Sequence, residues 1–208
     1  MRTMTALVLS LVFSSLSLAQ SGNSPQQLRT GASAYAVEPY FVATPDQLIR
    51  QGVNRLTGFL IGVEDATPEA VQEFVNLEIA GYFDFAYMAR WAAGPFYQRL
   101  DTAQKAAMTA KMKDLFLGAL ARNLGSLQRP IPRIDVFPAR PGRSVNEASV
   151  TARVMANPRQ IRMNFRFYWS NHGWRVFDVS ANGASAVAFY RRYFNNMFRR
   201  YGPDAVLR

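Results

Sequence analysis

Few residues in this 208-residue sequence have the types and spacing that catalysis requires. His172 is the only histidine and lies in a predicted turn, and cysteine is absent. The sequence therefore offers no Cys-His pair, no usual zinc site and no recognisable Ser-His-Asp triad. No glycine-rich loop suggests a phosphate cradle either. We expect no enzymatic activity, no cofactor and no metal site.

Three further polar residues have sequence contexts that could carry chemistry, but each also has a structural interpretation. Ser185 follows Gly183 and Ala184 without the final glycine of a nucleophile elbow, so we predict that it caps the last helix. Asp84 precedes a short apolar helix and is expected to cap it. Asp178 lies within an apolar strand, where we expect it to pair with an arginine such as Arg191.

The apolar residues follow much clearer patterns. Residues 160–169 alternate between apolar and polar types, which predicts a strand with one apolar face. Turn residues at 170–173 and a second apolar run at 174–179 predict a hairpin. After residue 183 the apolar period changes to three or four, which is typical of an amphipathic helix.

The segments before this hairpin predict helices first and strands second. Start signals at Thr44, Thr67, Asp84 and Asp101 each precede a helical pattern, and strands are expected at 133–137 and 149–156. This order predicts an α+β fold. We expect a twisted antiparallel sheet of about four strands, with helices packed on one face and enclosing an apolar cavity.

The N-terminus carries the features of an export signal. Arg2 precedes a short apolar run, and Ser17-Leu18-Ala19 forms a small-x-small cleavage site. We therefore expect a signal peptide at 1–19, cleaved after Ala19, a disordered leader at 20–37 and a single domain at 38–208. The mature protein should be soluble and exported.

Basic residues exceed acidic ones, and the formal net charge of the whole chain is +10. For an exported protein this excess favours anionic lipid or another negatively charged surface as a partner. Nucleic acid is the intracellular interpretation of the same charge, and export argues against it. A basic surface that serves only solubility also stays open, because the arginines are scattered.

The sequence resembles the MlaC family, the periplasmic phospholipid-binding component of a lipid-asymmetry transport system, also called the toluene-tolerance auxiliary family. The similarity covers about residues 44–207 in ordered blocks. The matching blocks are Phe83-Asp84-Phe85, Met88-Ala89-Arg90, Gly94, Gln104, Trp174-Arg175-Val176-Phe177-Asp178-Val179, Gly183-Ala184-Ser185, Tyr190-Arg191 with Phe194, and Gly202-Pro203-Asp204.

The resemblance implies a periplasmic shuttle that holds phospholipid chains between sheet and helices without a chemical step. It also implies exchange with an inner-membrane ABC transporter complex and an outer-membrane lipoprotein–porin complex. Combining the resemblance with the apolar patterns, we predict a lipid-binding lining drawn from both halves of the chain. These residues are Phe85, Met88, Met112, Leu115, Phe116, Ile161, Met163, Phe165, Phe167, Trp174, Val176, Val187, Tyr190, Phe194 and Met197.

Several alternatives remain open at the level of sequence. A cone-shaped isomerase would need Asp178 or a tyrosine to face the cavity as an acid or base. A wide, short cavity would suit a hopanoid or a sterol, and a solid core would suit a purely structural protein. Arg90 and Arg191 match family positions, where contact with lipid phosphate and buried structural pairing are both open.

Overall fold

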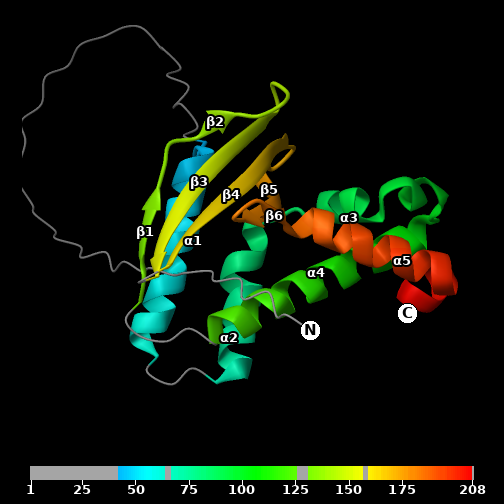
Figure 1. The fold of residues 1–208 in the computed structure, drawn as a ribbon, viewed down its shortest axis with the longest axis horizontal. Helices are drawn as coiled ribbons and strands as arrows, with labels where there is room; N and C mark the ends of the chain where they lie inside the picture. The colour runs from blue at the N-terminus through cyan, green and yellow to red at the C-terminus, as the bar shows by residue number, and fades with distance from the viewer. Residues whose placement is uncertain (1–41, 64–66, 126–130, 157–158, 208) are drawn as a thin grey trace, which may run out of the picture.

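The computed structural model describes residues 42–63, 67–125, 131–156 and 159–207 (Figure 1). The predicted signal peptide, the leader and the boundary at residue 38 lie outside these ranges. The helices come first: α1 (Pro45–Gly62), α2 (Pro68–Phe74) with a π-helical turn (Val75–Ile79) and a 3-10 turn (Ala80–Tyr82), α3 (Phe85–Ala93), a 3-10 segment (Gly94–Arg99) and α4 (Thr102–Gly125). The strands and the last helix follow: β1 (Arg133–Val136), β2 (Arg140–Pro141), β3 (Glu147–Ala156), β4 (Arg159–Ser170), β5 (Gly173–Ala181), β6 (Ala184–Ser185) and α5 (Ala186–Leu207).

The predicted helix starts are confirmed by their capping hydrogen bonds. The N–H of Thr44 donates to the Gln47 side chain at the start of α1, and the Thr67 hydroxyl accepts from the third residue of α2. Asp84 accepts from the N–H of Tyr87 at 2.8 Å, and Asp101 accepts from the N–H of Gln104 at 2.8 Å. These side chains satisfy backbone donors that have no partner inside their helices.

The strands form one antiparallel sheet in the order β1-β3-β4-β5-β6, with β2 also paired to β3. The α+β class is thus confirmed, and the short strands β2 and β6 bring the described sheet to six strands instead of about four. The register of β3 and β4 places Val150 opposite Phe165 and Ala152 opposite Met163 on the same face of the sheet, which we call the inner face. Thr151 and Arg153 therefore face the other way.

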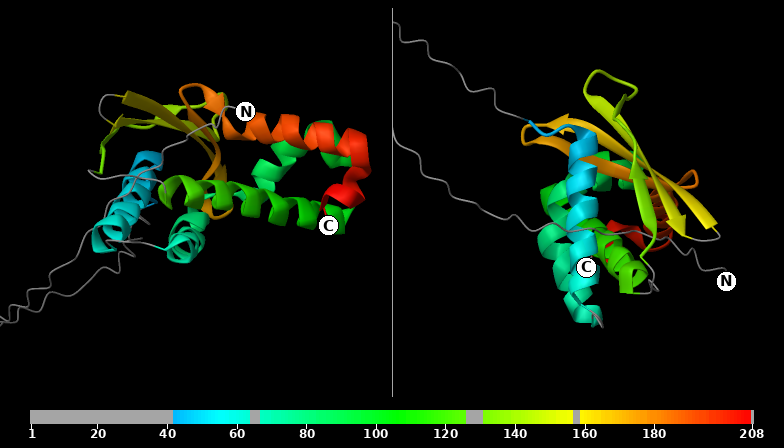
Figure 2. Two further views of the ribbon diagram at one scale, coloured as in Figure 1. Left: turned by 60° about the horizontal axis from the view of Figure 1, so that its bottom comes forward. Right: turned by 90° about the vertical axis from the view of Figure 1, so that its left-hand side faces the viewer.

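The inner face of the sheet packs against α1, which lies along it in all three views (Figures 1 and 2). Ile49 of α1 is buried among sheet residues, with Leu48 and Val53 beside it. We call this group the sheet cluster. Its buried members are Ile49, Ala148, Val150, Ala152, Val154, Met163, Phe165, Phe167 and Val176.

A second apolar group, the helical cluster, is formed mainly by α2, α3, α4 and α5, with Phe177 of the sheet. The two strands β4 and β5 shift register between Arg166 and Phe167, so that β5 carries one extra residue, a β-bulge. The bulge allows both Phe177 and Asp178 to lie on the outer face. There the Phe177 ring packs on Tyr168 and on Tyr87 of α3. Helices thus also contact the outer face at this end.

Asp178 connects the sheet to α5 and is only 4% exposed. Its carboxylate accepts hydrogen bonds from the Ser185 hydroxyl at 2.8 Å and from the N–H of Val187 at 3.1 Å. The paired arginine is Arg166, 3.8 Å away, so the expected partner Arg191 is wrong. The register explains this, because Arg166 lies directly opposite Asp178 whereas Arg191 projects from the exposed side of α5. Ser185 caps α5 as predicted, accepting from the N–H of Ala188.

Replacing the buried Asp178 should destabilise the protein strongly. Asp178→Asn removes the charge that Arg166 faces and places amide hydrogens where Ser185 and Val187 donate. We expect a loss of about 2–3 kcal/mol in the free energy of unfolding, measured by urea denaturation. The matched control is Asp135→Asn, because Asp135 also pairs with an arginine of the sheet, the 80% exposed Arg133. That change should cost less than about 1 kcal/mol, and equal losses in both variants would contradict the assignment.

Candidate functional site

An apolar cavity of about 80 Å³ lies between α1, the inner face of the sheet and α4. Its walls come from α1, the sheet and α4, and from the segment that joins α2 to α3. Apart from the ring and hydroxyl of Tyr82, the side chains around it are hydrocarbon or methionine. The lining residues are Leu48, Ile49, Gly52, Val53, Leu56, Ile79, Tyr82, Phe83, Phe116, Leu120, Met163, Phe165, Val176 and Val179.

The periodicity of each element places its side chains in this cavity. On α1, residues three or four apart share one face, and that face is turned toward the sheet. On the strands, alternate residues share one face, so Met163 and Phe165 of β4 line the cavity beside Val176 and Val179 of β5. Phe116 and Leu120 lie one turn apart on α4 and close the third side.

Phe83-Asp84-Phe85 forms the junction between the cavity and the helical cluster. Phe83 pairs with Val176 of β5 through a single bridge, in which the N–H of Asp84 donates to the Val176 carbonyl at 3.0 Å. The Phe83 ring lines the cavity and contacts the ring of Phe116, 4.9 Å between centroids. Phe85 is buried in the helical cluster. One tripeptide thereby fixes α3 and α4 relative to the sheet.

Asp84 also holds a tyrosine from the other face of the sheet. Its second carboxylate oxygen accepts a hydrogen bond from the Tyr168 hydroxyl, and the Tyr168 ring stacks on Tyr87, 4.1 Å between centroids. Burial, and then the hydrogen bond to Asp84, raise the pKa of Tyr168 above its ordinary range. Both carboxylate oxygens of Asp84 therefore have structural partners, which leaves it poorly placed to act as an acid or base.

Four of the residues predicted to bind lipid line this cavity: Phe116, Met163, Phe165 and Val176. Ile161, Phe167 and Trp174 belong to the same sheet cluster but lie outside the cavity wall. The others belong to the helical cluster, where several are fully buried against neighbouring helices. These are Phe85, Met88, Met112, Leu115, Val187, Tyr190, Phe194 and Met197. Contact of each of these residues with lipid stays a prediction.

The prediction from sequence did not include the contribution of α1. Five lining residues come from this helix, and its apolar stripe is visible in the sequence at Leu48, Ile49, Val53 and Leu56. The stripe predicts a buried helix face, but periodicity carries no information about which surface covers that face. The same holds for Ile79, Tyr82, Leu120 and Val179, whose positions depend on the packing of distant elements.

The charged residues singled out from the sequence lie away from the cavity. Arg90 and Arg191 are both exposed, which does not fit a buried ion pair, and neither lines the cavity. The Arg191 side chain passes close to Gly94, where φ is +57° and a β-carbon would stand 3.0 Å from Nε. Glycine is favoured there because of both the conformation and the close approach. His172 is exposed in the turn after β4, as expected.

The part of the chain that the structure describes contains neither a candidate metal site nor a helix that could span a membrane. No group of three or more His, Cys, Asp or Glu side chains could hold a metal ion there. Within the same ranges, every helix is too short or too polar to cross a membrane.

The fold and the cavity define an α+β protein with an apolar site between one sheet and its covering helices. The family model described as MlaC protein matches residues 62–208, and the chain therefore belongs to the MlaC family. The resemblance seen in the sequence is thus confirmed. The match begins at the last residue of α1, so the five lining residues from α1 precede it.

A search of solved structures gives the same fold. A phospholipid-binding protein from Ralstonia solanacearum, solved in complex with a phospholipid, superposes with a TM-score of 0.70. The two sequences are 20% identical, and the alignment covers 79% of this chain and 93% of that one. At this identity the likeness establishes the architecture. No curated protein matches the chain significantly.

The contact between Asp84 and Tyr168 should make stability fall at alkaline pH. The pKa of Tyr168 is raised by folding, so its neutral form is favoured in the folded state and the unfolded chain loses the proton first, at about pH 10. The stabilisation is complete below that pH and declines as the pH rises through the folded-state value. In urea titrations, the stability difference between wild type and Tyr168→Phe should be constant from pH 7 to about 9 and shrink above about 10. A difference that does not change with pH would contradict this. Tyr82 and Tyr190, whose pKa values are also raised, are present in both proteins and cancel.

Proposed function

We propose that this protein binds a phospholipid and carries it through the periplasm between the outer and inner membranes. The observation that supports this most directly is the apolar cavity, bounded by sheet and helices, in a chain of the MlaC family. The phospholipid in the similar structure from Ralstonia solanacearum adds support for the ligand class. Binding without chemistry also agrees with the roles of Asp84 and Asp178, whose carboxylates are occupied by structural hydrogen bonds.

The energetics require a carrier that encloses most of its ligand. A lipid with two chains of about fifteen methylenes each costs on the order of 24 kcal/mol to expose to water, at about 0.8 kcal/mol per methylene. Apolar side chains that replace water around both chains offset this cost. The sheet cluster, with α1 covering it, supplies such a surface.

The cavity in this structure is too small for the proposed ligand. Its volume of about 80 Å³ is well below that of an engineered cavity of about 150 Å³ that accepts one benzene molecule. Lipid entry therefore requires two walls to separate. We infer that α1 is the wall that moves, because it covers the inner face mainly through apolar side chains that an acyl chain can replace.

Among the described residues, α1 makes few polar contacts with the rest of the protein, and these contacts lie near the protein surface. Arg50 donates to the Val136 carbonyl of β1 at 2.7 Å, and Arg55 forms an exposed ion pair with Glu78. Exposed ion pairs of this type contribute little to stability. Within the described ranges the buried hydroxyl of Thr57 has no hydrogen-bond partner, so α1 is held there by burial more than by directed bonds.

An isomerase acting on an apolar substrate is the second candidate function. It requires an acid or base that faces the cavity, and Asp178 instead pairs with Arg166 on the outer side of the sheet. Among the described residues, Tyr82 carries the only hydroxyl in the cavity wall, and burial raises its pKa, so the hydroxyl stays protonated at neutral pH and is poorly suited to act as an acid or a base. Both observations favour the carrier.

The direct test is mass spectrometry of organic extracts from protein purified without detergent. We expect phospholipid in repeated preparations, at a constant ratio to protein. Recovery of a hopanoid or sterol instead would replace the phospholipid assignment, and recovery of no lipid would count against a carrier. Exchange with an inner-membrane ABC transporter and an outer-membrane lipoprotein–porin complex belongs to the same proposal, and transfer of labelled lipid to each purified complex tests it.

Filling the cavity should strongly reduce lipid loading while the protein stays folded. In Val53→Trp, the indole occupies space on the cavity side of α1. Excluding even two methylenes, at about 0.8 kcal/mol each, weakens lipid affinity about tenfold or more. The matched control is Asn54→Trp, which adds the same ring at the exposed neighbouring position. Lipid content is measured after extraction and folding by circular dichroism. Equal lipid content in both variants would place the binding site elsewhere.

The export step has a separate test. The predicted signal peptide ends at Ala19, so the N-terminal residue of the mature protein from the periplasmic fraction should be Gln20. Intact-mass spectrometry of that fraction measures this, because an N-terminal glutamine can cyclise and block Edman sequencing. A mature chain that still begins at Met1 would contradict periplasmic transport, whatever the cavity binds.

A further inference from the structure

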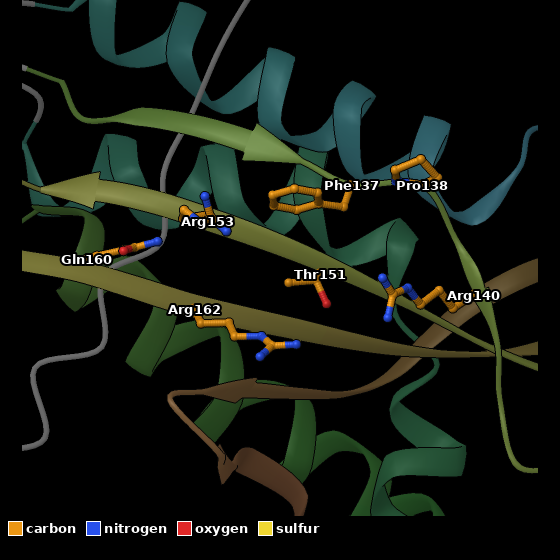
Figure 3. Close-up of a pocket in the computed structure, with 7 residues that line it drawn as sticks. All are labelled: Phe137, Pro138, Arg140, Thr151, Arg153, Gln160 and Arg162. Carbon is orange, nitrogen blue, oxygen red and sulfur yellow. The ribbon is translucent and has the colours of Figure 1, made fainter.

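A basic groove of about 250 Å³ runs along the outer face of the sheet, opposite the face that carries the cavity (Figure 3). Three guanidinium groups, a hydroxyl and an amide border it, and no lining residue is acidic. We call it the arginine groove. Its lining residues are Phe137, Pro138, Arg140, Thr151, Arg153, Gln160 and Arg162.

Strand register places two like charges next to each other in this groove. Arg153 of β3 is directly opposite Arg162 of β4, so their β-carbons are neighbours across the strands. Like charges in this arrangement destabilise a sheet. Within the described residues, neither arginine has a carboxylate within ion-pairing distance, and the same is true of Arg140. Among the described residues, no ion pair therefore neutralises the two opposed charges.

The acidic residues of the described strands pair with other arginines. Asp135 is opposite Arg153 in the register of β1 and β3, but its carboxylate pairs with Arg133 at 2.9 Å. Glu147 and Asp178 both lie beside Arg166, at 3.6 and 3.8 Å. The guanidinium groups of the groove therefore keep their hydrogen-bond donors available.

The groove is also held in position by its neighbours. The Arg153 guanidinium lies over the Phe137 ring, 5.1 Å from its centroid, which limits its movement. Figure 3 shows the side chains of Arg140 and Arg162 extending toward Thr151 from opposite sides. The Thr151 hydroxyl accepts a hydrogen bond from the Asn164 amide at 3.4 Å, so its own hydrogen can be donated into the groove.

From this arrangement we infer that the arginine groove is a binding site for a phosphate group. Guanidinium forks match the oxygen spacing of phosphate and form paired, charge-assisted hydrogen bonds with it. Three of them, with a hydroxyl and the Gln160 amide, suit a tetrahedral anion with several acceptor oxygens. A bound phosphate would also neutralise the opposed charges of Arg153 and Arg162.

This site is separate from the proposed lipid cavity, because the sheet lies between them. The headgroup of a lipid whose chains fill the cavity cannot supply this phosphate. The phosphate comes either from a soluble phosphate compound or from an anionic lipid in a membrane surface. The phosphate site does not rest on the proposed function. Loss of phosphate binding would leave the lipid content measured after extraction unchanged, so the two proposals can fail separately.

The first experiment measures phosphate binding by isothermal titration calorimetry and by the rise in melting temperature with inorganic phosphate, against chloride at the same ionic strength. The test variant is Arg153→Gln with Arg162→Gln, and the control is Arg192→Gln with Arg199→Gln, two exposed arginines of α5. Both variants lose the same charge. We expect the test variant to bind at least about tenfold more weakly, and the control to bind like wild type. The comparison also removes the general stabilisation by phosphate as a salt.

The second experiment uses flotation of vesicles made of phosphatidylcholine with or without phosphatidylglycerol. Binding of inorganic phosphate with no difference between the vesicles supports a soluble phosphate compound. Flotation with the phosphatidylglycerol vesicles that the test variant loses and the control keeps supports a membrane lipid. Binding of neither probe by wild type, or equal loss in test and control variants, would overturn the site. If the test variant fails to fold, Thr151→Val and Gln160→Ala singly must each weaken binding for the site to stand.

Discussion

The inner face of the sheet is apolar along three strands, and it has to be covered because hydrocarbon surface of that extent is unstable in water. Val150, Met163 and Phe165 form its centre, and α1 covers them. The Phe83-Asp84-Phe85 tripeptide then fixes the helical cluster at one edge of this face, through the bridge to Val176 and the contact of Asp84 with Tyr168. The cavity lies where the sheet cluster and the helical cluster meet, and both clusters contribute side chains to its wall.

Much of this fold could be predicted from local sequence chemistry. Caps at Asp84 and Ser185 are determined by neighbouring residues, and the alternation in β4 shows which side chains share a face. The bulge that brings Phe177 and Asp178 to one face depends on the pairing of two strands, and local alternation does not reveal it. For this reason the sequence does not identify Arg166 as the partner of Asp178. The surface that covers the apolar stripe of α1 could not be predicted either, since a periodic pattern shows that a helix face is buried but not which element packs against it.

Under the proposed function, the same apolar side chains would serve two states of the protein, with and without lipid. In the structure described, Ile49 and Val53 of α1 are satisfied by contact with the sheet, and in a loaded state acyl chains would take the place of part of that contact. The free energy needed to separate α1 from the sheet would then be offset by burial of the acyl chains, because each buried methylene replaces apolar contact that the separation removes. A small cavity is therefore compatible with the proposed function, because a large empty one would lose dispersion contacts throughout its wall. A deep, permanent cavity would instead reduce stability before any ligand arrived.

The two faces of the sheet obey opposite constraints, and this is why they can carry separate sites. Side chains at alternate positions of β3 and β4 project to opposite faces, so Ala152 and Met163 enter the sheet cluster while Arg153 and Arg162 line the groove. An apolar site needs a cover that excludes water, whereas guanidinium groups need access to water or to an anion because they are strongly destabilised when buried alone. Helix α1 meets the first need on the inner face. On the outer face, α3 and α5 cover the end around Tyr168 and Phe177 and leave the Arg153 and Arg162 end open. An element that closed this end would bury two opposed cations that have no carboxylate partner among the described residues, so the sequence of β3 and β4 favours a groove that stays open to solvent.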